Sequence, residues 1–267
     1  MRITVLTVCY NEEEMIYSFL AHYAGLGVNR IVVYNNKSTD RTVEICNQFA
    51  KDYAGCKIEI VDYDTNGQIR DDVYLEIKNN AWKKYKSDYY IVVDCDEFLE
   101  VKDGDQFDKK RLVRYLATMK KGYVLPKVIG VQTVTDSFED LFDLGTSEDK
   151  KYVLDDTFNK RCIFSRELVP VYRPGCHMFG VNPSDKAKLE TSLAVESKVE
   201  PLYLFHLKYV DRDYVVKRHA EFKTRLSDFN KKHNYGHQYE MDEKTINLKF
   251  DYLKRYAITR DEVFANA

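Results

Sequence analysis

The N-terminal part of the chain alternates between short apolar runs and segments with helical spacing, and this alternation constrains the fold most. Apolar runs bounded by polar residues predict buried strands, whereas apolar residues three and four positions apart predict helices. Such a series favours an α/β domain with a mostly parallel central sheet and helices on both faces. The expected strands are Ile3 to Cys9, Arg30 to Tyr34, Lys57 to Asp62 and Tyr89 to Asp94, with helices at about 13–24, 40–53 and 72–86.

The pattern changes in the second half of the chain. From about Gly122 to Tyr209 it predicts short strands separated by loops, and from Asp213 onward it turns helical. We therefore expect one α/β domain over residues 1–210, built from halves at 1–105 and 106–210, and a helical C-terminal extension at 211–267. The apolar stripes of this extension are typical of packing faces, against its own core or against a second subunit.

Composition excludes some functions. The 267 residues carry 41 Lys and Arg against 43 Asp and Glu, and this near-neutral balance argues against a nucleic-acid partner. The six cysteines form no C-x-x-C pair, which predicts free thiols in a reducing compartment. No apolar stretch reaches the length of roughly 18 residues that predicts a membrane span. We expect a cytoplasmic protein that associates at most peripherally with the inner face of a membrane.

Polar residues follow each of the four predicted strands. In open α/β sheets, ligands bind beyond the carboxyl ends of the strands. The segments at this edge predict a ligand site there: Tyr10-Asn11-Glu12, Asn35-Asn36-Lys37-Ser38, Tyr63-Asp64 and Asp94-Cys95-Asp96.

Asp94 and Asp96 give the strongest local signal. Two carboxylates so close repel each other unless a cation or hydrogen bonds compensate them. Oxygen ligands at the end of a strand suit Mg²⁺ or Mn²⁺, with water and phosphate completing the shell. A solvated acidic turn is the inert alternative. A haloacid-dehalogenase-type phosphatase is disfavoured by Phe98 after the motif and by the three strands before it.

Three ordered segments resemble family 2-type glycosyltransferases of the GT-A fold: V-L-T-V-C-Y-N-E-E at 5–13, Y-N-N-K-S-T-D-R-T at 34–42 and V-D-C-D-E-F-L at 93–99. His206 is similar to the late His that ends their catalytic core. The resemblance implies a sugar transfer from a nucleotide-sugar donor to a saccharide or glycolipid acceptor, with inversion, in polysaccharide biosynthesis. UDP is the preferred nucleotide, although Asn35 stands where an Asp is commoner, which leaves the base open.

The resemblance also implies site residues. Residues 1–105 would form the nucleotide-sugar-binding half and 106–210 the acceptor side. Mn²⁺ or Mg²⁺ would bind Asp94, Asp96 and His206. The donor would contact the remaining matched or neighbouring positions: Tyr10, Asn11, Asn36, Lys78, Asp94 and His177. Each has a structural alternative, such as strand-end packing for Tyr10 or a surface position for Lys78.

Direct displacement also needs a carboxylate that takes the proton of the acceptor hydroxyl. The candidates are Asp136, Glu139, Asp155 and Asp156, of which we favour Asp155 or Asp156 because they precede a short predicted strand. An aromatic acceptor platform is expected near Tyr172 or Phe179.

Two other functions stay open. A sugar-1-phosphate nucleotidyltransferase usually has a Gly-rich basic loop after the first strand, but residues 10–14 here are acidic and lack Gly. An inactive nucleotide-sugar- or carbohydrate-binding module is the second alternative.

Overall fold

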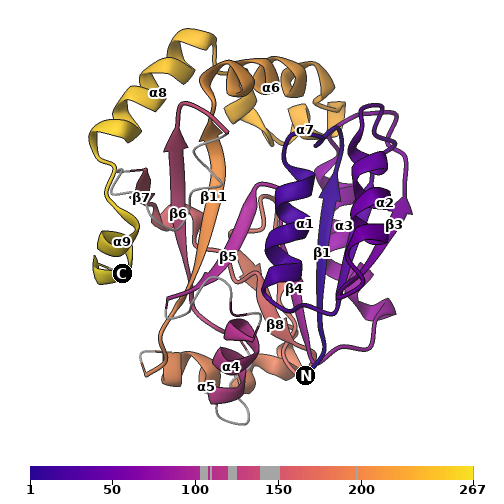
Figure 1. Cartoon of the computed structure of the whole chain (residues 1–267), viewed down its shortest axis with the longest axis vertical. Helices are drawn as coiled ribbons and strands as arrows, with labels where there is room; N and C mark the ends of the chain where they lie inside the picture. The colour runs from indigo at the N-terminus through magenta and orange to yellow at the C-terminus, as the bar shows by residue number, and fades with distance from the viewer. Residues whose placement is uncertain (103–107, 109, 120–124, 139–150, 197, 267) are drawn as a thin grey trace.

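The computed structural model describes residues 1–102, 108, 110–119, 125–138, 151–196 and 198–266 (Figure 1). Its strands are β1 Ile3–Cys9, β2 Arg30–Asn35, β3 Lys57–Asp62, β4 Tyr89–Val92, β5 Glu97–Val101, β6 Val128–Thr135, β7 Tyr152–Leu154, β8 Ile163–Ser165, β9 Val171–Tyr172, β10 Phe179–Gly180 and β11 Leu202–Val210. Its helices are α1 Ile16–Gly25, α2 Thr42–Asp52, α3 Asp71–Asn80, α4 Arg111–Thr118, α5 Lys186–Glu196, α6 Arg212–Arg225, α7 Asp228–Lys232, α8 Glu243–Arg255 and α9 Arg260–Asn266. Short 3₁₀ turns lie at Ala81–Lys84, Asp156–Phe158, Pro183–Asp185 and His237–Glu240.

The main sheet has the strand order β3-β2-β1-β4-β8, and its first four strands are parallel. Strand β8 is antiparallel to β4. Alternate side chains of β1 and β2 face opposite layers, so both faces are buried. Val5 and Ile31 pack in one core cluster with residues of α1 and α2, whereas Leu6 and Val32 pack in a second cluster with Ala81 after α3. The predicted α/β class, with a mostly parallel sheet covered on both faces, is confirmed.

A second sheet, of order β5-β11-β6-β7, lies beside the first (Figure 1). Strand β11 runs antiparallel to β5 and parallel to β6. The main sheet's β4 ends at Val92 and β5 of the second sheet begins at Glu97, so residues 93–96 join the two sheets. Asp94 and Asp96 therefore lie at the junction rather than at the end of the longer strand that we predicted.

The C-terminal helices pack on the second sheet and reach a loop of the N-terminal half. Phe250 of α8 lies in a third core cluster with Val134 of β6, and α9 follows a bridge between Ile258 and Tyr152. At the other end of the segment, the backbone of Ile69 pairs with that of Leu226, directly after α6. The extension thus folds back across the second sheet to the N-terminal half (Figure 1).

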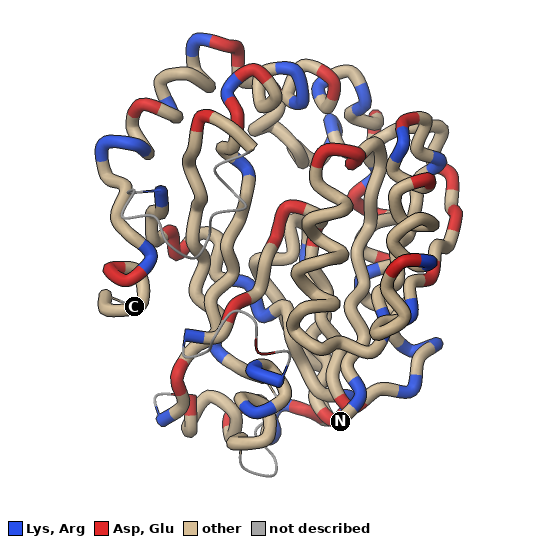
Figure 2. The backbone as a smooth tube through the Cα atoms, viewed as in Figure 1, with Lys and Arg blue, Asp and Glu red and all other residues tan. Residues whose placement is uncertain are grey.

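Several helix starts are capped by the side chains that favour this position. Asp211 and Asp242 are the N-caps of α6 and α8 and accept from the Tyr214 and Thr245 amides. Asp40 lies one residue before the N-cap of α2, and its Oδ1 accepts from the Thr42 amide. In the described residues, no helix combines the length and apolar character that a membrane crossing demands. Figure 2 shows Lys and Arg interspersed with Asp and Glu along the C-terminal helices.

Candidate active site

A cavity of about 770 Å³ lies where the carboxyl ends of β1 and β4 meet the second sheet and the C-terminal helices. Six residues predicted from the sequence line it: Tyr10, Lys78, Asp94, Asp96, His177 and His206. Helix α6 and the turn after α7 supply residues that the sequence did not point to: Arg218, His219, Phe222, Arg225, Gly236, His237, Gln238 and Tyr239. Both ends of the chain therefore contribute to this cavity.

Asp94 is held by two lysines. Lys78 Nζ donates to Asp94 Oδ1 at 2.6 Å, and Lys160 Nζ lies 3.5 Å from Asp94 Oδ2 and 2.5 Å from Glu97 Oε2. Lys160 has no solvent exposure, whereas the Asp94 side chain is 38% exposed and lines the cavity. Burial opposes ionisation of Asp94, but the two ammonium groups outweigh it and hold the pKa of this carboxyl well below its usual range. Asp94 is thus ionised.

Asp96 faces His206 across the junction of the sheets. Asp96 Oδ2 lies 3.3 Å from His206 Nε2, and His206 Nδ1 lies 3.5 Å from Gln132 Nε2 on β6. Burial disfavours the Asp96 carboxylate, but His206 more than compensates and lowers the pKa of Asp96. The side chains are 17% and 12% exposed, so both are enclosed by protein yet reachable from the cavity.

The second predicted His is positioned through Phe158. The Phe158 ring lies between His177 and His206, with centroid distances of 5.2 and 4.8 Å. Phe158 belongs to the 3₁₀ turn Asp156–Phe158, which fits against β6 because Gly130 has no side chain. A Cβ at Gly130 would meet the Phe158 carbonyl carbon at 2.5 Å. Burial lowers the pKa of His177 to about 4, so its ring is neutral at pH 7, and its Nδ1 has no hydrogen-bond partner among the described residues.

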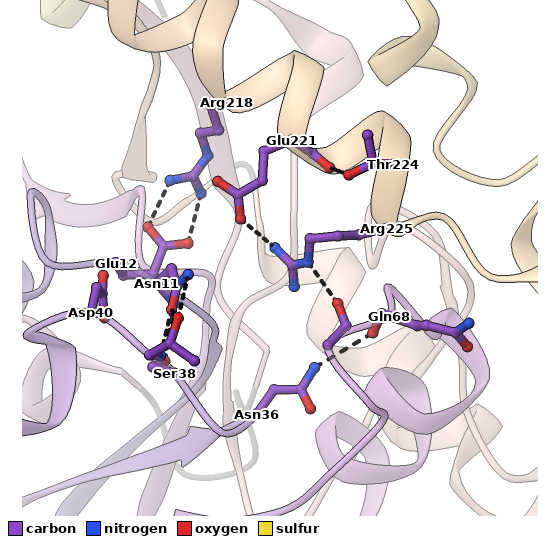
Figure 3. Close-up of polar contacts among 12 residues, drawn as sticks. Asn11, Glu12, Asn36, Ser38, Asp40, Gln68, Arg218, Glu221, Thr224 and Arg225 are labelled. Carbon is purple, nitrogen blue, oxygen red and sulfur yellow. Dashed lines mark hydrogen bonds and ion pairs between the residues drawn. The ribbon is translucent and has the colours of Figure 1, made fainter.

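Helix α6 is tied to the turn after β1 (Figure 3). Arg218 donates to both carboxylate oxygens of Glu12, each at 2.7 Å, across 206 positions of sequence. About two turns further along α6, Arg225 Nε donates to the Gly67 carbonyl at 2.6 Å, and its guanidinium lies 3.6 Å from the centroid of the Tyr10 ring. One face of Tyr10 is therefore covered by Arg225, and a nucleobase on that face would displace or stack on the guanidinium.

Asn11 and Asn36 organise loops beside the cavity (Figure 3). Asn11 Oδ1 accepts from the Thr39 amide at 2.8 Å, which joins the turns after β1 and β2. Asn36 is fully buried. Its Nδ2 donates to the Thr65 hydroxyl and to the Gln68 carbonyl, and its Oδ1 accepts from the Thr65 amide. Neither is among the residues that line the cavity. Their direct contact with a donor stays a prediction, while their structural contacts are established.

The predicted catalytic carboxylates lie at the edge of the site. Asp155 Oδ1 accepts from the Thr157 amide and hydroxyl, and Asp156 Oδ1 accepts from Asn159. Neither is among the residues that line the cavity, although Thr157 is. Their role as base stays a prediction.

The remaining sequence candidates lie elsewhere. Asp136 pairs with Lys254 outside the cavity, and Glu139 falls outside the described residues. The Tyr172 ring is buried in the second core cluster and its hydroxyl donates to the Arg161 carbonyl. Neither Tyr172 nor Phe179 lines the cavity, so an acceptor platform near them stays a prediction.

The residues that we missed on α6 carried a weak signal. Arg218, Phe222 and Arg225 lie three and four positions apart, so they share one face of the helix. We interpreted the neighbouring apolar stripe as packing. Arg218 and Arg225, beside that stripe, were the indication that this face of α6 also lines a cavity.

One comparison with known proteins shows the family. Residues 4–140 match the family model described as Glycosyl transferase family 2. Among solved structures, a mannosyltransferase from Pyrobaculum calidifontis in complex with GDP-Man and Mn²⁺ is 17% identical, with a TM-score of 0.39; the match covers 62% of this chain and 45% of that one. A glucosyl-3-phosphoglycerate synthase from Mycobacterium tuberculosis, in complex with Mn²⁺, UDP and glucosyl-3-phosphoglycerate, is 19% identical, with a TM-score of 0.32 and coverages of 48% and 44%. The chain thus spans less than half the length of these two proteins. A search of curated proteins gives no match.

Proposed function

The chain belongs to glycosyl transferase family 2, and from this premise we propose that it transfers a sugar from a nucleotide-sugar donor to an acceptor hydroxyl in the cavity described above. The observation that carries the proposal is the pair of Asp96 and His206, which face each other on the cavity wall beside the lysine-bound Asp94. Donor, metal and acceptor would meet at the junction of the two sheets, on a GT-A type of fold.

The residues present fit a divalent cation. Two cis ligands of an octahedral ion with bonds of about 2.1 Å lie about 3 Å apart, close to the 3.3 Å between Asp96 Oδ2 and His206 Nε2. Within the described residues no group of three or more His, Cys, Asp or Glu has the spacing of a complete metal site. Water and donor phosphates would therefore supply the remaining ligands of Mn²⁺ or Mg²⁺, as is usual for these ions. The cation would stabilise the charge that develops on the departing diphosphate.

Asp94 and Lys78 would serve the donor. An ammonium group has three donors, and Lys78 uses one on Asp94 while lining the cavity. The other two would bind phosphate oxygens of the donor, the role predicted from the sequence. Asp94 Oδ2 meets Lys160 only at 3.5 Å, which leaves that oxygen available for a ribose hydroxyl or for the metal. Tyr10 and Arg225 would enclose the base, with Asn11 and Asn36 holding the loops around it.

The proton of the acceptor hydroxyl requires a carboxylate that faces the cavity. Glu12, Asp94, Asp96 and Glu97 line it but are each paired with a cation or with His206. Asp71 also lines the cavity, and no ion pair of its carboxylate occurs in the described part of the chain. Burial raises the pKa of Asp71, as suits a general base. We therefore add Asp71 to the predicted Asp155 and Asp156 as a candidate base.

The cysteines support the proposed cellular setting. All six are free thiols and all are buried, which supports a reducing compartment such as the cytoplasm. A saccharide or glycolipid acceptor, UDP as the nucleotide and an inverting displacement remain parts of the proposal, as do peripheral membrane association and oligomerisation through the C-terminal helices.

The test measures nucleotide diphosphate release from a panel of nucleotide sugars with Mn²⁺, for the wild type and for Asp96→Asn. Metal-dependent release that falls by at least about 100-fold in the variant would support the proposal. Metal-independent binding of a donor without turnover would instead indicate a binding module.

A further inference from the structure

Most charged side chains that line the cavity have a partner of opposite charge. The pairs are Glu12 with Arg218, Asp94 with Lys78, Asp96 with His206 and Arg225 with Glu221. Lys208 differs. It lines the cavity, yet within the described ranges its ammonium group has no hydrogen bond and no carboxylate within 4.0 Å. A half-buried ammonium without a counter-ion is costly, and a bound anion would offset that cost.

Lys208 is separate from the lysines around Asp94. It lies on β11, two residues after His206, on the side of the cavity that Tyr239 lines. Lys78 and Lys160 instead lie 2.6 and 3.5 Å from the Asp94 carboxylate oxygens. The cavity therefore has two cationic regions. Lys78 binds Asp94, on the side of the predicted nucleotide, and Lys208 lies near Tyr239, in the turn that follows α7.

The surroundings of Lys208 suit a sugar ring. Its Nζ lies 6.0 Å from the centroid of Tyr239, whose ring packs edge-on against Phe222 at 4.7 Å and against His219 at 5.5 Å. His219 is 3% exposed, lines the same cavity, and its Nδ1 has no hydrogen-bond partner among the described residues. An aromatic ring packs on the C–H face of a sugar, and an unpartnered imidazole nitrogen can bond a hydroxyl.

We propose that Lys208, His219 and Tyr239 form the acceptor subsite, and that this subsite binds a sugar carrying an anionic group, either a carboxylate or a phosphate monoester. The inference rests on the proposed function, because it assumes that the nucleotide occupies the opposite side of Asp96. The ammonium of Lys208 holds the anionic group, Tyr239 supports the ring, and His219 bonds a ring hydroxyl. A neutral sugar leaves Lys208 unpaired and binds more weakly.

The experiment has a donor arm and an acceptor arm, both read as thermal shifts. The donor arm uses UDP and GDP with Mn²⁺. The acceptor arm adds D-glucuronate, its neutral methyl ester, or D-glucose 6-phosphate to the nucleotide-bound protein. We expect one or both anionic sugars to raise the melting temperature and the ester to have about 10- to 100-fold lower affinity, the range for losing a charged hydrogen bond. Lys208→Met should lose the preference for the anion and keep the nucleotide shift, whereas Lys208→Arg should retain both.

Lys244→Met on α8 is the matched control, because this lysine is exposed and does not line the cavity. It should behave as the wild type in both arms. Three results would overturn the inference: anionic sugars that bind Lys208→Met as well as the wild type, a wild type that prefers the neutral ester, or a Lys208→Met variant that loses nucleotide binding while its melting temperature without ligand is unchanged. Failure of the proposed function is distinct, since it would show as no nucleotide shift in the wild type.

Discussion

Lys160 Nζ lies 2.5 Å from Glu97 Oε2, and neither side chain is open to solvent. The same ammonium reaches Asp94, which Lys78 also binds, so two lysines balance the charges of two carboxylates. Asp96 is outside this balance and has His206 as its partner. The acidic segment at 94–97 is therefore divided, with Asp94 and Glu97 neutralised by the protein and Asp96 left for a cation.

Replacing Lys160 by Met should destabilise the fold strongly. Removing one partner of a buried ion pair leaves an uncompensated charge, at a cost of about 3–5 kcal/mol. Urea denaturation of the ligand-free protein measures the change in the free energy of unfolding. Lys57→Met is the control, because Lys57 forms an exposed pair with Glu59 that should be worth less than about 1 kcal/mol. Equal losses in the two variants would show that Glu97 finds another partner or takes up a proton.

Asp96→Asn and Asp94→Asn should affect Mn²⁺ binding unequally. We expect Asp96→Asn to lower the affinity for Mn²⁺ by about 100-fold or more. Residues that only orient the metal ligands typically cost about 10- to 100-fold in affinity. Asp94→Asn should fall within or below that range, since the lysines already engage its oxygens. Titration of Mn²⁺ by electron paramagnetic resonance in the presence of UDP gives both affinities. A larger loss in Asp94→Asn would make Asp94 the main ligand.

The pair of Glu12 and Arg218 should hold helix α6 on the cavity. Arg218→Met should raise hydrogen exchange of backbone amides across α6, and it should cost about 3–5 kcal/mol because Glu12 is buried. Arg212→Met is the control on the same helix, since its pair with Asp251 is exposed. The double variant Glu12→Gln, Arg218→Met completes a cycle. A coupling energy near zero would show that other contacts hold α6.

The bounds of two strands could be predicted from the sequence because the signals that set them are local. β1 and β3 have the predicted bounds, since apolar runs and their polar limits determine a strand without reference to distant residues. The helix predicted to reach Lys86 instead ends at Asn80, where the chain enters a 3₁₀ turn. The junction of β4 and β5 was also misjudged, because Val93 is as apolar as the strand but leads into a second sheet.

In the candidate site, too, the local motif residues could be predicted from the sequence, whereas their long-range partners could not. Asp94, Asp96 and His206 were predicted by motif, and they line one cavity. The partners of these residues were not predicted, because Lys160 comes from the segment before β8 and Arg218 from α6. Contacts across 66 and 206 positions leave no periodic signal in the sequence. Only the fold brings them together.

Acid should destabilise the protein between about pH 6.5 and pH 4, partly through His219. Burial, with Lys208 and Arg218 nearby, lowers the pKa of His219 to about 4, whereas its ordinary value is 6.5. Between these values the unfolded chain binds the proton and the folded one does not, so stability falls as the pH falls. His219→Gln should reduce this loss by up to about 3 kcal/mol, at 1.36 kcal/mol per pKa unit. Urea denaturation at pH 7.0 and 4.5 measures it, with the exposed His233→Gln as control. If the loss of unfolding free energy between pH 7.0 and 4.5 were the same in His219→Gln and in the wild type, His219 would not be the group that takes up the proton.

Asp71→Asn and Asp155→Asn should distinguish Asp71 from Asp155, two of the three candidate bases. Removing a general base typically lowers kcat by about 10²- to 10⁴-fold with little effect on donor binding. We expect this for Asp71→Asn, because Asp71 lines the cavity and has a raised pKa. Asp155→Asn should change kcat by less than about 5-fold, since that carboxylate only caps a short turn. The base must be deprotonated, so the wild-type kcat should rise with pH through the pKa of Asp71, and this limb should vanish in Asp71→Asn. Loss of the limb in Asp155→Asn instead would return the role to Asp155, one of the two residues predicted from the sequence.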